Sequence, residues 1–342
     1  MRRQTVVIGG LSALLILALV LLAQPDELGE ELAKTNYLIL SMVVLLYLAN
    51  MGLKSGRWYV LLRAIGKKVP YLHCLSYFSI GQAFNNAIPG RVAGEAGRVY
   101  TLHSQEGINA GTGLATIVTE RLMDLVLITV LAATGLILLF PELVEQVRGS
   151  LVFVVALAVG LNAAILIFLS RPRWIERTGR LVSRVSERVL PNTIGQRISK
   201  GILNHTRSFN STLRTWGDGN KGLLTLAGGL TILIWVNEVA RLYLIMLALG
   251  SDAPLLAMMI ASALATLSAV FLSAGSGNVV MVSAVFTAAG VGFSTATTAG
   301  ILSAMTSIWL SIPIGVLAMT LTGIKNVREE SRKDLEKRER DA

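Results

Sequence analysis

The chain has 342 residues, of which 53% are hydrophobic and only 15% charged, with a formal net charge of +10. Soluble domains carry roughly a quarter charged residues, so this composition excludes an ordinary soluble protein. The single cysteine excludes an intramolecular disulfide and a thiolate metal cluster. Uncharged windows of about 20 residues, the length that crosses a bilayer core as a helix, recur along the chain. We therefore predict an all-α polytopic membrane protein.

About six spanning helices are predicted from the hydrophobic stretches. They cover residues 5–23, 37–65, 110–140, 150–170, 222–249 and 294–322. The first stretch follows two arginines and has features of a cleavable signal peptide, but its apolar run is long and Leu21 spoils the small-residue cleavage pattern. We interpret it as a retained first helix.

The distribution of basic residues predicts the orientation of these helices, because cytoplasmic loops are enriched in Lys and Arg. The N-terminal arginine pair places the N-terminus inside. Residues 54–70 carry five basic residues and no acidic one, and residues 171–221 carry eleven basic against three acidic residues, so both segments are assigned to the cytoplasm. The charged tail 323–342 is assigned there as well. We expect a multi-pass protein of the cell membrane with both termini cytoplasmic.

Two further segments begin and end on the same side of the membrane under this assignment. Residues 71–108 and 255–291 each contain two apolar halves separated by a helix break. Irregular backbone at membrane depth is tolerated only where protein or a wet cavity surrounds it. We interpret both segments as re-entrant hairpins, the alternative for 71–108 being one tilted spanning helix. The residues assigned to the breaks are Pro89, Gly90, Gly275 and Gly277.

The two halves of the chain have matching hydropathy. A shift of about 184 residues superposes the two hairpins, and also helix 37–65 on helix 222–249. This predicts two membrane repeats of opposite topology, residues 1–140 and 150–322, an arrangement typical of secondary transporters. The second repeat includes the basic, amphipathic cytoplasmic insert 171–221.

Within this insert, five arginines recur at helical spacing, beside a neighbouring apolar face. The arginines are Arg173, Arg177, Arg180, Arg184 and Arg188, and the apolar residues are Trp174, Leu181, Val185 and Val189. The pattern predicts either an interfacial helix on an anionic inner leaflet or a solvated linker helix. Because the basic excess follows membrane topology, we expect no nucleic-acid partner.

Each charged residue at the centre of a spanning helix raises the free energy of membrane insertion by about 2.5–3.5 kcal/mol, so the charges inside the apolar segments need a structural or functional explanation. They are Arg91, Glu95, Arg98, Glu120, Arg121, Asp124, Glu238 and Arg241. One interpretation is that these residues pair with one another and hold the bundle together. The other is an anion site, in which arginines and the start of a half-helix coordinate a lipid phosphate or a soluble anion.

Other chemistry has little support in the sequence. No glycine-rich phosphate loop of the Walker type occurs, so direct use of ATP is not expected. The three histidines lack metal-ligand spacing. We therefore assign no catalytic residue, no metal site and no cofactor.

The stretch "PGRVAGEAGRVYTL", followed by "TERLMD", resembles the P-x-R-x-G-G-E-x-x-R and E-R-x-x-D signatures of the lysylphosphatidylglycerol synthase transmembrane-region family. That family includes the flippase domain of the bacterial multiple peptide resistance factor. The resemblance covers nearly the whole chain and implies a membrane domain that binds and translocates lipids. The residues that match the signatures are Pro89, Arg91, Gly94, Glu95, Arg98, Glu120, Arg121 and Asp124.

The sequence departs from the family pattern at three places. Ala93 replaces the first glycine of the pair, and residues 273–280 read "SAGSGNVV" where relatives usually show P-G-G-x-G-x-x-E. No arginine lies near Thr306. The outer half of the predicted site is therefore polar but uncharged. The insert is also too short for an aminoacyl-transfer domain, so a complete lysyl-lipid synthase is not expected.

These observations predict a lipid translocase that exposes a central groove alternately to the two sides of the membrane. Its substrate is expected to be an anionic phospholipid or a polyprenyl phosphate. Arg91, Arg98 and Arg121 are expected to hold the phosphate, while Glu95 and Glu120 position these arginines or exchange protons.

Two alternatives come from other functional classes. One is a membrane enzyme that modifies a lipid or a polyprenyl-phosphate sugar, with Glu120 or Asp124 as general base. Some relatives are linked to polyprenyl-phosphate sugar metabolism, but the sequence has no nucleotide-sugar motif. The other is a partner subunit of a separate lipid-modifying synthase. The sequence also leaves open a homo-oligomer.

Overall fold

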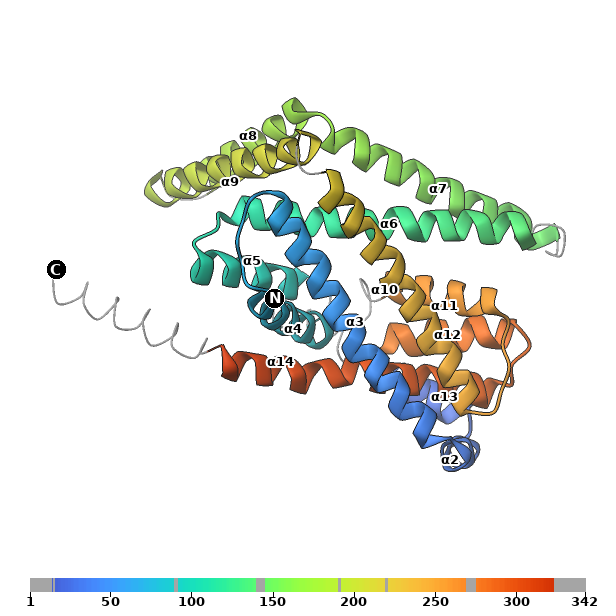
Figure 1. Cartoon of the computed structure of the whole chain (residues 1–342). Helices are drawn as coiled ribbons and strands as arrows, with labels where there is room; N and C mark the ends of the chain where they lie inside the picture. The colour runs from blue at the N-terminus through green and yellow to red at the C-terminus, as the bar shows by residue number, and fades with distance from the viewer. Residues whose placement is uncertain are drawn as a thin grey trace.

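The computed structural model describes residues 14, 16–88, 92–139, 145–189, 192–218, 221–268 and 275–322, and in this part of the chain it consists of helices joined by short connections, without strands (Figure 1). Residues 16–22 are helical, which agrees with the first predicted helix. The labelled helices are α2 (Pro25–Lys34), α3 (Tyr37–Ala64), α4 (Tyr71–Ala87), α5 (Val92–Glu106), α6 (Ala110–Leu139), α7 (Glu145–Leu169), α8 (Pro172–Val189), α9 (Asn192–Asp218), α10 (Lys221–Ala248), α11 (Leu255–Ser268), α12 (Ser276–Ala288), α13 (Phe293–Ala304), the π-helical turn η1 (Met305–Trp309) and α14 (Leu310–Leu321).

The positions of the long helices agree with the predicted spans. Helices α3, α6 and α10 begin and end within one residue of the expected bounds, and α13, η1 and α14 together form the last one. Among the described residues, three helical stretches are long and apolar enough to cross a membrane: α3, α10 and Phe293–Leu321. Hydropathy alone was sufficient to find these helices because each has a continuous apolar run.

Helices α3 and α10 run side by side through the middle of the molecule (Figure 1). Polar groups join them where they cross. The amide of Asn50 donates to the side-chain oxygen of Asn237 at 2.8 Å and to the carbonyl of Ile234 at 3.3 Å. Lys54 Nζ lies 2.8 Å from Glu238 Oε1. Because polar groups at membrane depth must find partners within the protein, these bonds fix where the two helices cross.

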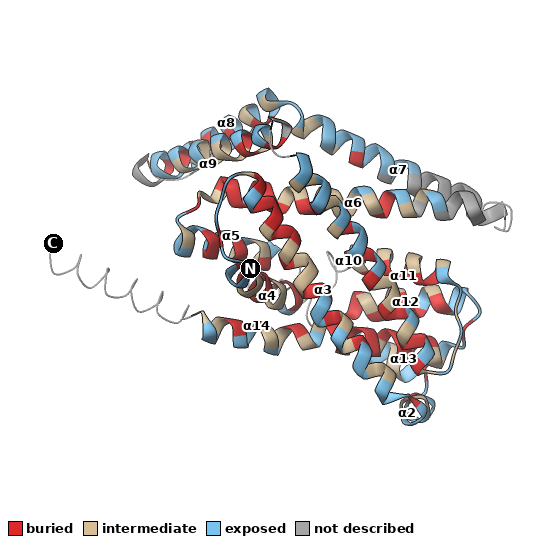
Figure 2. Cartoon of the chain, viewed as in Figure 1, coloured by how far each residue is buried: buried red, intermediate tan, exposed pale blue. Residues whose placement is uncertain are grey.

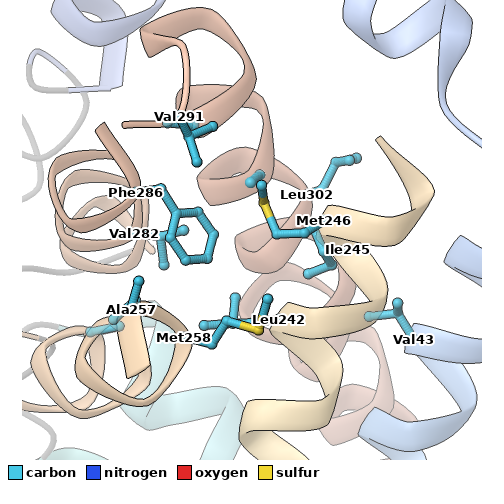
Figure 3. Packing of buried hydrophobic residues seen from close by; sticks show 14 residues of the cluster. Val43, Leu242, Ile245, Met246, Ala257, Met258, Val282, Phe286, Val291 and Leu302 are labelled. Atoms are coloured by element: carbon cyan, nitrogen blue, oxygen red, sulfur yellow. The ribbon is translucent and has the colours of Figure 1, made fainter. Parts of the chain in front are cut away.

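A hydrophobic cluster surrounds one end of this crossing and draws α11, α12 and α13 onto α10 (Figure 3). Phe286 of α12 is fully buried among Met246 of α10, Val282 of its own helix and Leu302 of α13. Val43 contributes from α3. The second hairpin is thereby packed onto the α3–α10 pair by dispersion contacts rather than by charge.

Helices α4 and α5 fold back on each other as an antiparallel pair. The hydroxyl of Tyr77 donates to Glu106 at 2.9 Å at one end, and the backbone N–H of Gly94 donates to Asn85 Oδ1 at 2.9 Å at the other. The two residues of the predicted break, Pro89 and Gly90, lie outside the described residues, as does Arg91. The described helices on either side agree with the two halves predicted for residues 71–108.

Helices α11 and α12 form the corresponding pair in the second half of the chain. Gly275 precedes α12 with φ +88°, a left-handed conformation that glycine adopts at little cost. Gly277, which was assigned to the break, lies within the first turn of α12. Residues 269–274 lie outside the described part of the chain.

Helix α8 presents three different faces. It packs on α9 through Ile175, Gly179 and Ser183, which are buried. Its five arginines are exposed, as are the residues of its apolar face, among them Leu181 and Val189. Figure 2 shows how much of this helix is exposed. An exposed apolar face beside an arginine face favours the interfacial interpretation of the insert over a solvated linker.

The closest approach of α4 and α5 predicts an effect of substitution. A Cβ atom at position 94 would overlap the carbonyl oxygen of Gly81, which is backbone and cannot rotate away. We expect Gly94→Ala to lower the stability of the purified chain by about 1–3 kcal/mol, measured by unfolding in detergent. Gly97→Ala on the same helix is the control, because its Cβ would meet only Phe84 Cδ2 at 3.9 Å. Equal stability of the two variants would contradict this packing.

Candidate functional site

The two halves of the chain meet at a pocket with a volume of about 120 Å³. Its lining residues come from α3 to α6 in the first half of the chain and from α10 to η1 in the second. The volume holds several water molecules or a compact polar group, whereas a whole lipid would be too large. The charged residues that line it are Lys54, Arg57, Arg98, Glu120, Arg121, Asp124, Glu238 and Arg241.

Most of the residues predicted for the site are brought together here. Six of the nine predicted binding residues line the pocket, and Glu95 bonds to two of them. Gly94 lies in the α4–α5 contact behind the pocket and allows α5 to approach α4 closely. Arg91 lies outside the described residues, so the structure does not position it.

Arg98 of α5 is held between two carboxylates. Its two terminal nitrogens lie 3.0 Å from Glu95 Oε2 and 2.7 Å from Glu120 Oε2. Its guanidinium also lies 4.2 Å from the ring centre of Trp58 and 4.9 Å from that of Phe78. With only 1% of its side chain exposed, Arg98 is a fixed positive charge inside the protein.

Arg57 of α3 is held in the same way from the opposite side. It binds both carboxylate oxygens of Asp124, at 2.6 and 3.0 Å, and its Nε lies 3.7 Å from Glu120 Oε1. Arg121 pairs with Glu95 and lies 3.9 Å from Asp124 Oδ2.

These six residues form a closed cycle in which each charge lies between two of opposite sign. We call it the charge ring, and its members in order are Arg121, Glu95, Arg98, Glu120, Arg57 and Asp124. Three arginines and three carboxylates leave the ring neutral, which is the condition for burying so many charges. The interpretation that the membrane charges pair with one another therefore holds for these residues.

A second charged group lies on the α3–α10 crossing. Glu238 binds Lys54 at 2.8 Å and Arg241 at 2.8 Å, which gives this group one excess positive charge. The guanidinium of Arg241 also lies 5.2 Å from the ring centre of Tyr47. Because Glu95 makes the ring neutral, the charges around the pocket sum to the one excess positive charge of this second group, and they favour an anion.

Three buried arginines of the pocket keep an N–H group without an acceptor. The Nε atoms of Arg57, Arg98 and Arg241 have no hydrogen-bond partner among the described residues. A buried donor left unsatisfied costs about 1–3 kcal/mol. Arg57 Nε faces Glu120 Oε1, which also lacks a hydrogen-bond partner among the described residues, at 3.7 Å. The donors of Arg98 and Arg241 are therefore the ones that a ligand with acceptor oxygens would satisfy.

Sequence reasoning missed Lys54 and Arg57. Both fall inside the predicted helix 37–65, but they were counted among the five basic residues that assign segment 54–70 to the cytoplasm and not among the charges of the site. The structure places both in the pocket lining, on α3. The sequence contains another pattern that could have identified these two residues. Tyr47 and Asn50 precede them at helical spacing, so that the four side chains form one polar face on an otherwise apolar helix.

Comparison with known proteins identifies the family of this chain. Residues 6–315 match the family model for the lysylphosphatidylglycerol synthase TM region. The chain belongs to this family. No solved structure matches it significantly.

Curated relatives of this member of the lysylphosphatidylglycerol synthase TM family include archaeal membrane proteins. A UPF0104 membrane protein of Methanothermobacter thermautotrophicus is 27% identical over 315 residues, which cover 90% of this chain and 92% of the relative. A UPF0104 membrane protein of Methanocaldococcus jannaschii is 23% identical over 86% of this chain and 82% of its own length. The glycosyltransferase AglD of Haloferax volcanii is 26% identical over 73% of this chain but only 42% of its own length.

The charge ring predicts a specific pattern of stabilities. Arg57→Gln leaves the ring with one uncompensated negative charge, and we expect it to cost about 3–5 kcal/mol of unfolding free energy in detergent. Adding Asp124→Asn restores neutrality and is expected to recover part of that loss. Lys34→Gln is the control, because its pair with Glu30 is exposed and should contribute less than about 1 kcal/mol. Additive losses in the double variant would argue against a neutral ring.

Proposed function

We propose that this membrane protein is a lipid translocase whose pocket binds the phosphate of an anionic phospholipid or a polyprenyl phosphate. The observation that carries the proposal is the group of buried pocket arginines whose Nε–H donors have no acceptor among the described residues. Phosphate oxygens suit such donors because an arginine can donate two nearly parallel bonds to one phosphate.

The charge ring suggests how a phosphate enters. Arg121 is its most accessible member, with 46% of its side chain exposed, while Arg98 and Glu120 are almost fully buried. We propose that the phosphate replaces Glu95 as a partner of Arg121, and that Arg98 and Lys54 stabilise the bound anion. Glu95 then moves aside or takes a proton. Arg91 is proposed as a further phosphate ligand from the start of the half-helix.

The α3–α10 crossing supports the inverted repeats. Lys54 pairs with Glu238, and Asn50 with the carbonyl of Ile234. Each pair is separated by 184 residues, the same shift that superposes the two halves of the sequence. In two repeats related by a two-fold axis, a residue close to the axis contacts its own equivalent. We propose that this crossing lies on that axis.

The paired helices α4–α5 and α11–α12 fit the proposed re-entrant hairpins, one entering from each side of the membrane. Movement of one repeat against the other about the α3–α10 crossing would expose the pocket first to one side and then to the other. The acyl or prenyl chains stay in the bilayer while the head group crosses. This is the alternating access common in transporters with inverted repeats.

Orientation, location and partners follow as part of the same proposal. We propose a multi-pass protein of the cell membrane with both termini in the cytoplasm, and membrane lipids as its partners. Helix α8 would then lie on the anionic cytoplasmic leaflet, its arginines beside the lipid phosphates. A homo-oligomer, or a complex with a separate lipid-modifying synthase, is compatible with this arrangement.

A second candidate function is a membrane enzyme or partner subunit in the modification of a polyprenyl-phosphate sugar. The relative that carries the word glycosyltransferase in its name favours it, although the match covers less than half of that protein. Incubation of the pure chain with radiolabelled donor sugars and a polyprenyl phosphate separates the two candidates. Transfer of label to the lipid would favour the enzyme.

Translocation can be measured in proteoliposomes that contain a fluorescent anionic lipid, with dithionite added outside. We expect the wild-type chain to make more than half of the signal accessible to dithionite. Arg121→Gln and Arg98→Ala should each slow this step about tenfold or more, because each removes a charge-assisted hydrogen bond of about 1.5–3 kcal/mol. Because Arg121 is less buried than Arg98, Arg121→Gln should perturb folding less. A loss of transport in this variant can therefore be attributed to the phosphate site.

The matched control is Arg63→Gln, which removes an exposed arginine of α3 that does not line the pocket. Its transport should equal that of the wild type. Normal transport by both pocket variants at equal reconstituted amounts would contradict the proposed phosphate site. The wild-type chain is tested with phospholipids and with a polyprenyl phosphate. If quenching is no faster than in empty liposomes for either kind of lipid, the result favours the second candidate function.

A further inference from the structure

The pocket has two walls of different chemistry. Every charged lining residue comes from α3, α5, α6 or α10. The opposite wall comes from α11, α12, α13 and η1, which lie together on the other side of α10 (Figure 1). We call this second surface the neutral wall, and its polar members are Ser262, Thr266, Asn278, Ser303 and Ser307.

The lack of charge in the neutral wall is a property of the sequence. Residues 253–324, which contain all four of its elements, include no Asp, Glu, Lys, Arg or His. No movement of these helices can therefore bring a carboxylate to the pocket. Every polar contact from this side must be made by a hydroxyl, an amide or the backbone.

One hydroxyl of the neutral wall has no hydrogen-bond partner within the described part of the chain. Ser262 is only 7% exposed, and its Oγ atom makes no hydrogen bond to any described residue. The other groups of the wall are engaged locally: the amide of Asn278 donates to Ser303 Oγ at 2.9 Å, and Thr266 donates to the carbonyl of Ser262 at 2.9 Å. A serine hydroxyl both donates and accepts, so a hydroxyl of a ligand could use both capacities, whereas an ammonium could use only the acceptor.

The charge of the pocket distinguishes between the possible lipid head groups. With Glu95 counted, the charges around the pocket sum to one excess positive charge, and each carboxylate that lines the pocket is already bound to a lysine or an arginine. A cationic head group would bring more positive charge and find no carboxylate on the neutral wall. A neutral group rich in hydroxyls, in contrast, could satisfy Ser262 while its phosphate lies at the arginines.

We propose that the pocket selects lipids whose phosphate carries an uncharged, hydroxyl-rich group, such as a sugar or a polyol, over lipids with a cationic head group. The inference rests on the proposed function, because it takes the pocket as the head-group site of a lipid phosphate. It adds the class of substrate, and it assigns Ser262 and Asn278 as residues that determine specificity.

The test uses the purified full chain in detergent and three lipids with the same two octanoyl chains. These are phosphatidic acid, phosphatidylinositol and lysyl-phosphatidylglycerol, so that only the head group differs. Dissociation constants are measured by the shift of intrinsic tryptophan fluorescence. We expect phosphatidylinositol to bind about tenfold more tightly than lysyl-phosphatidylglycerol, a ratio that corresponds to about 1.4 kcal/mol. Phosphatidic acid should lie between the two.

Two variants examine the neutral wall. Ser262→Ala should weaken the binding of phosphatidylinositol more than that of phosphatidic acid, because only the former offers hydroxyls to the missing group. Asn278→Asp adds a carboxylate to the wall and should shift the preference toward lysyl-phosphatidylglycerol. Ser283→Ala is the control, because this buried hydroxyl bonds to Thr297 at 2.8 Å outside the pocket lining and should leave all three constants unchanged.

The outcomes separate this inference from the proposed function. Equal affinity for the three lipids, with all three weakened by Arg121→Gln, would overturn the selectivity and leave the phosphate site standing. The selectivity would also be overturned if neither Ser262→Ala nor Asn278→Asp changed the order of affinities. Binding that is absent for every lipid, or insensitive to Arg121→Gln, would overturn the phosphate site and the inference with it.

Discussion

The structure depends on the neutralisation of charges that the sequence carries into apolar helices. Isolated arginines and carboxylates at membrane depth are costly, and the charge ring removes most of that cost by placing each between two of opposite sign. The ring ties α3, α5 and α6 together. Helix positions in the first half of the chain are therefore set by ion pairs as much as by packing.

The second half of the chain is held by other means. Helices α11 to α13 contain no charge and pack on α10 through Phe286, Met246 and their neighbours (Figure 3). The pocket lies where this apolar half meets the charged one, and both properties of the proposed substrate follow from that position. The arginines favour the phosphate, and the hydroxyls and amides opposite them favour a neutral polar head group.

Helix positions were predictable because hydropathy reports them directly. The apolar runs located α3, α6 and α10 to within one residue, and the proline and glycine positions separated α4 from α5 and α11 from α12. The sequence also singled out Arg98, Glu120 and Asp124 as charges within apolar segments, and all three line the pocket. Lys54 and Arg57 were missed because a rule that counts basic residues cannot distinguish a loop charge from one that points inward along a helix.

The amino-acid sequence by itself determined the class of protein, the helices and the family, since each depends on composition or on residues near one another in the chain. Only the tertiary structure decided which charged residues form ion pairs with one another. Glu95 could have paired with Arg98 alone, as helical spacing suggests, but it also binds Arg121, and Arg57 reaches Asp124 from 67 residues away. Such partners depend on how α3, α5 and α6 are placed in space, and no local spacing encodes that placement.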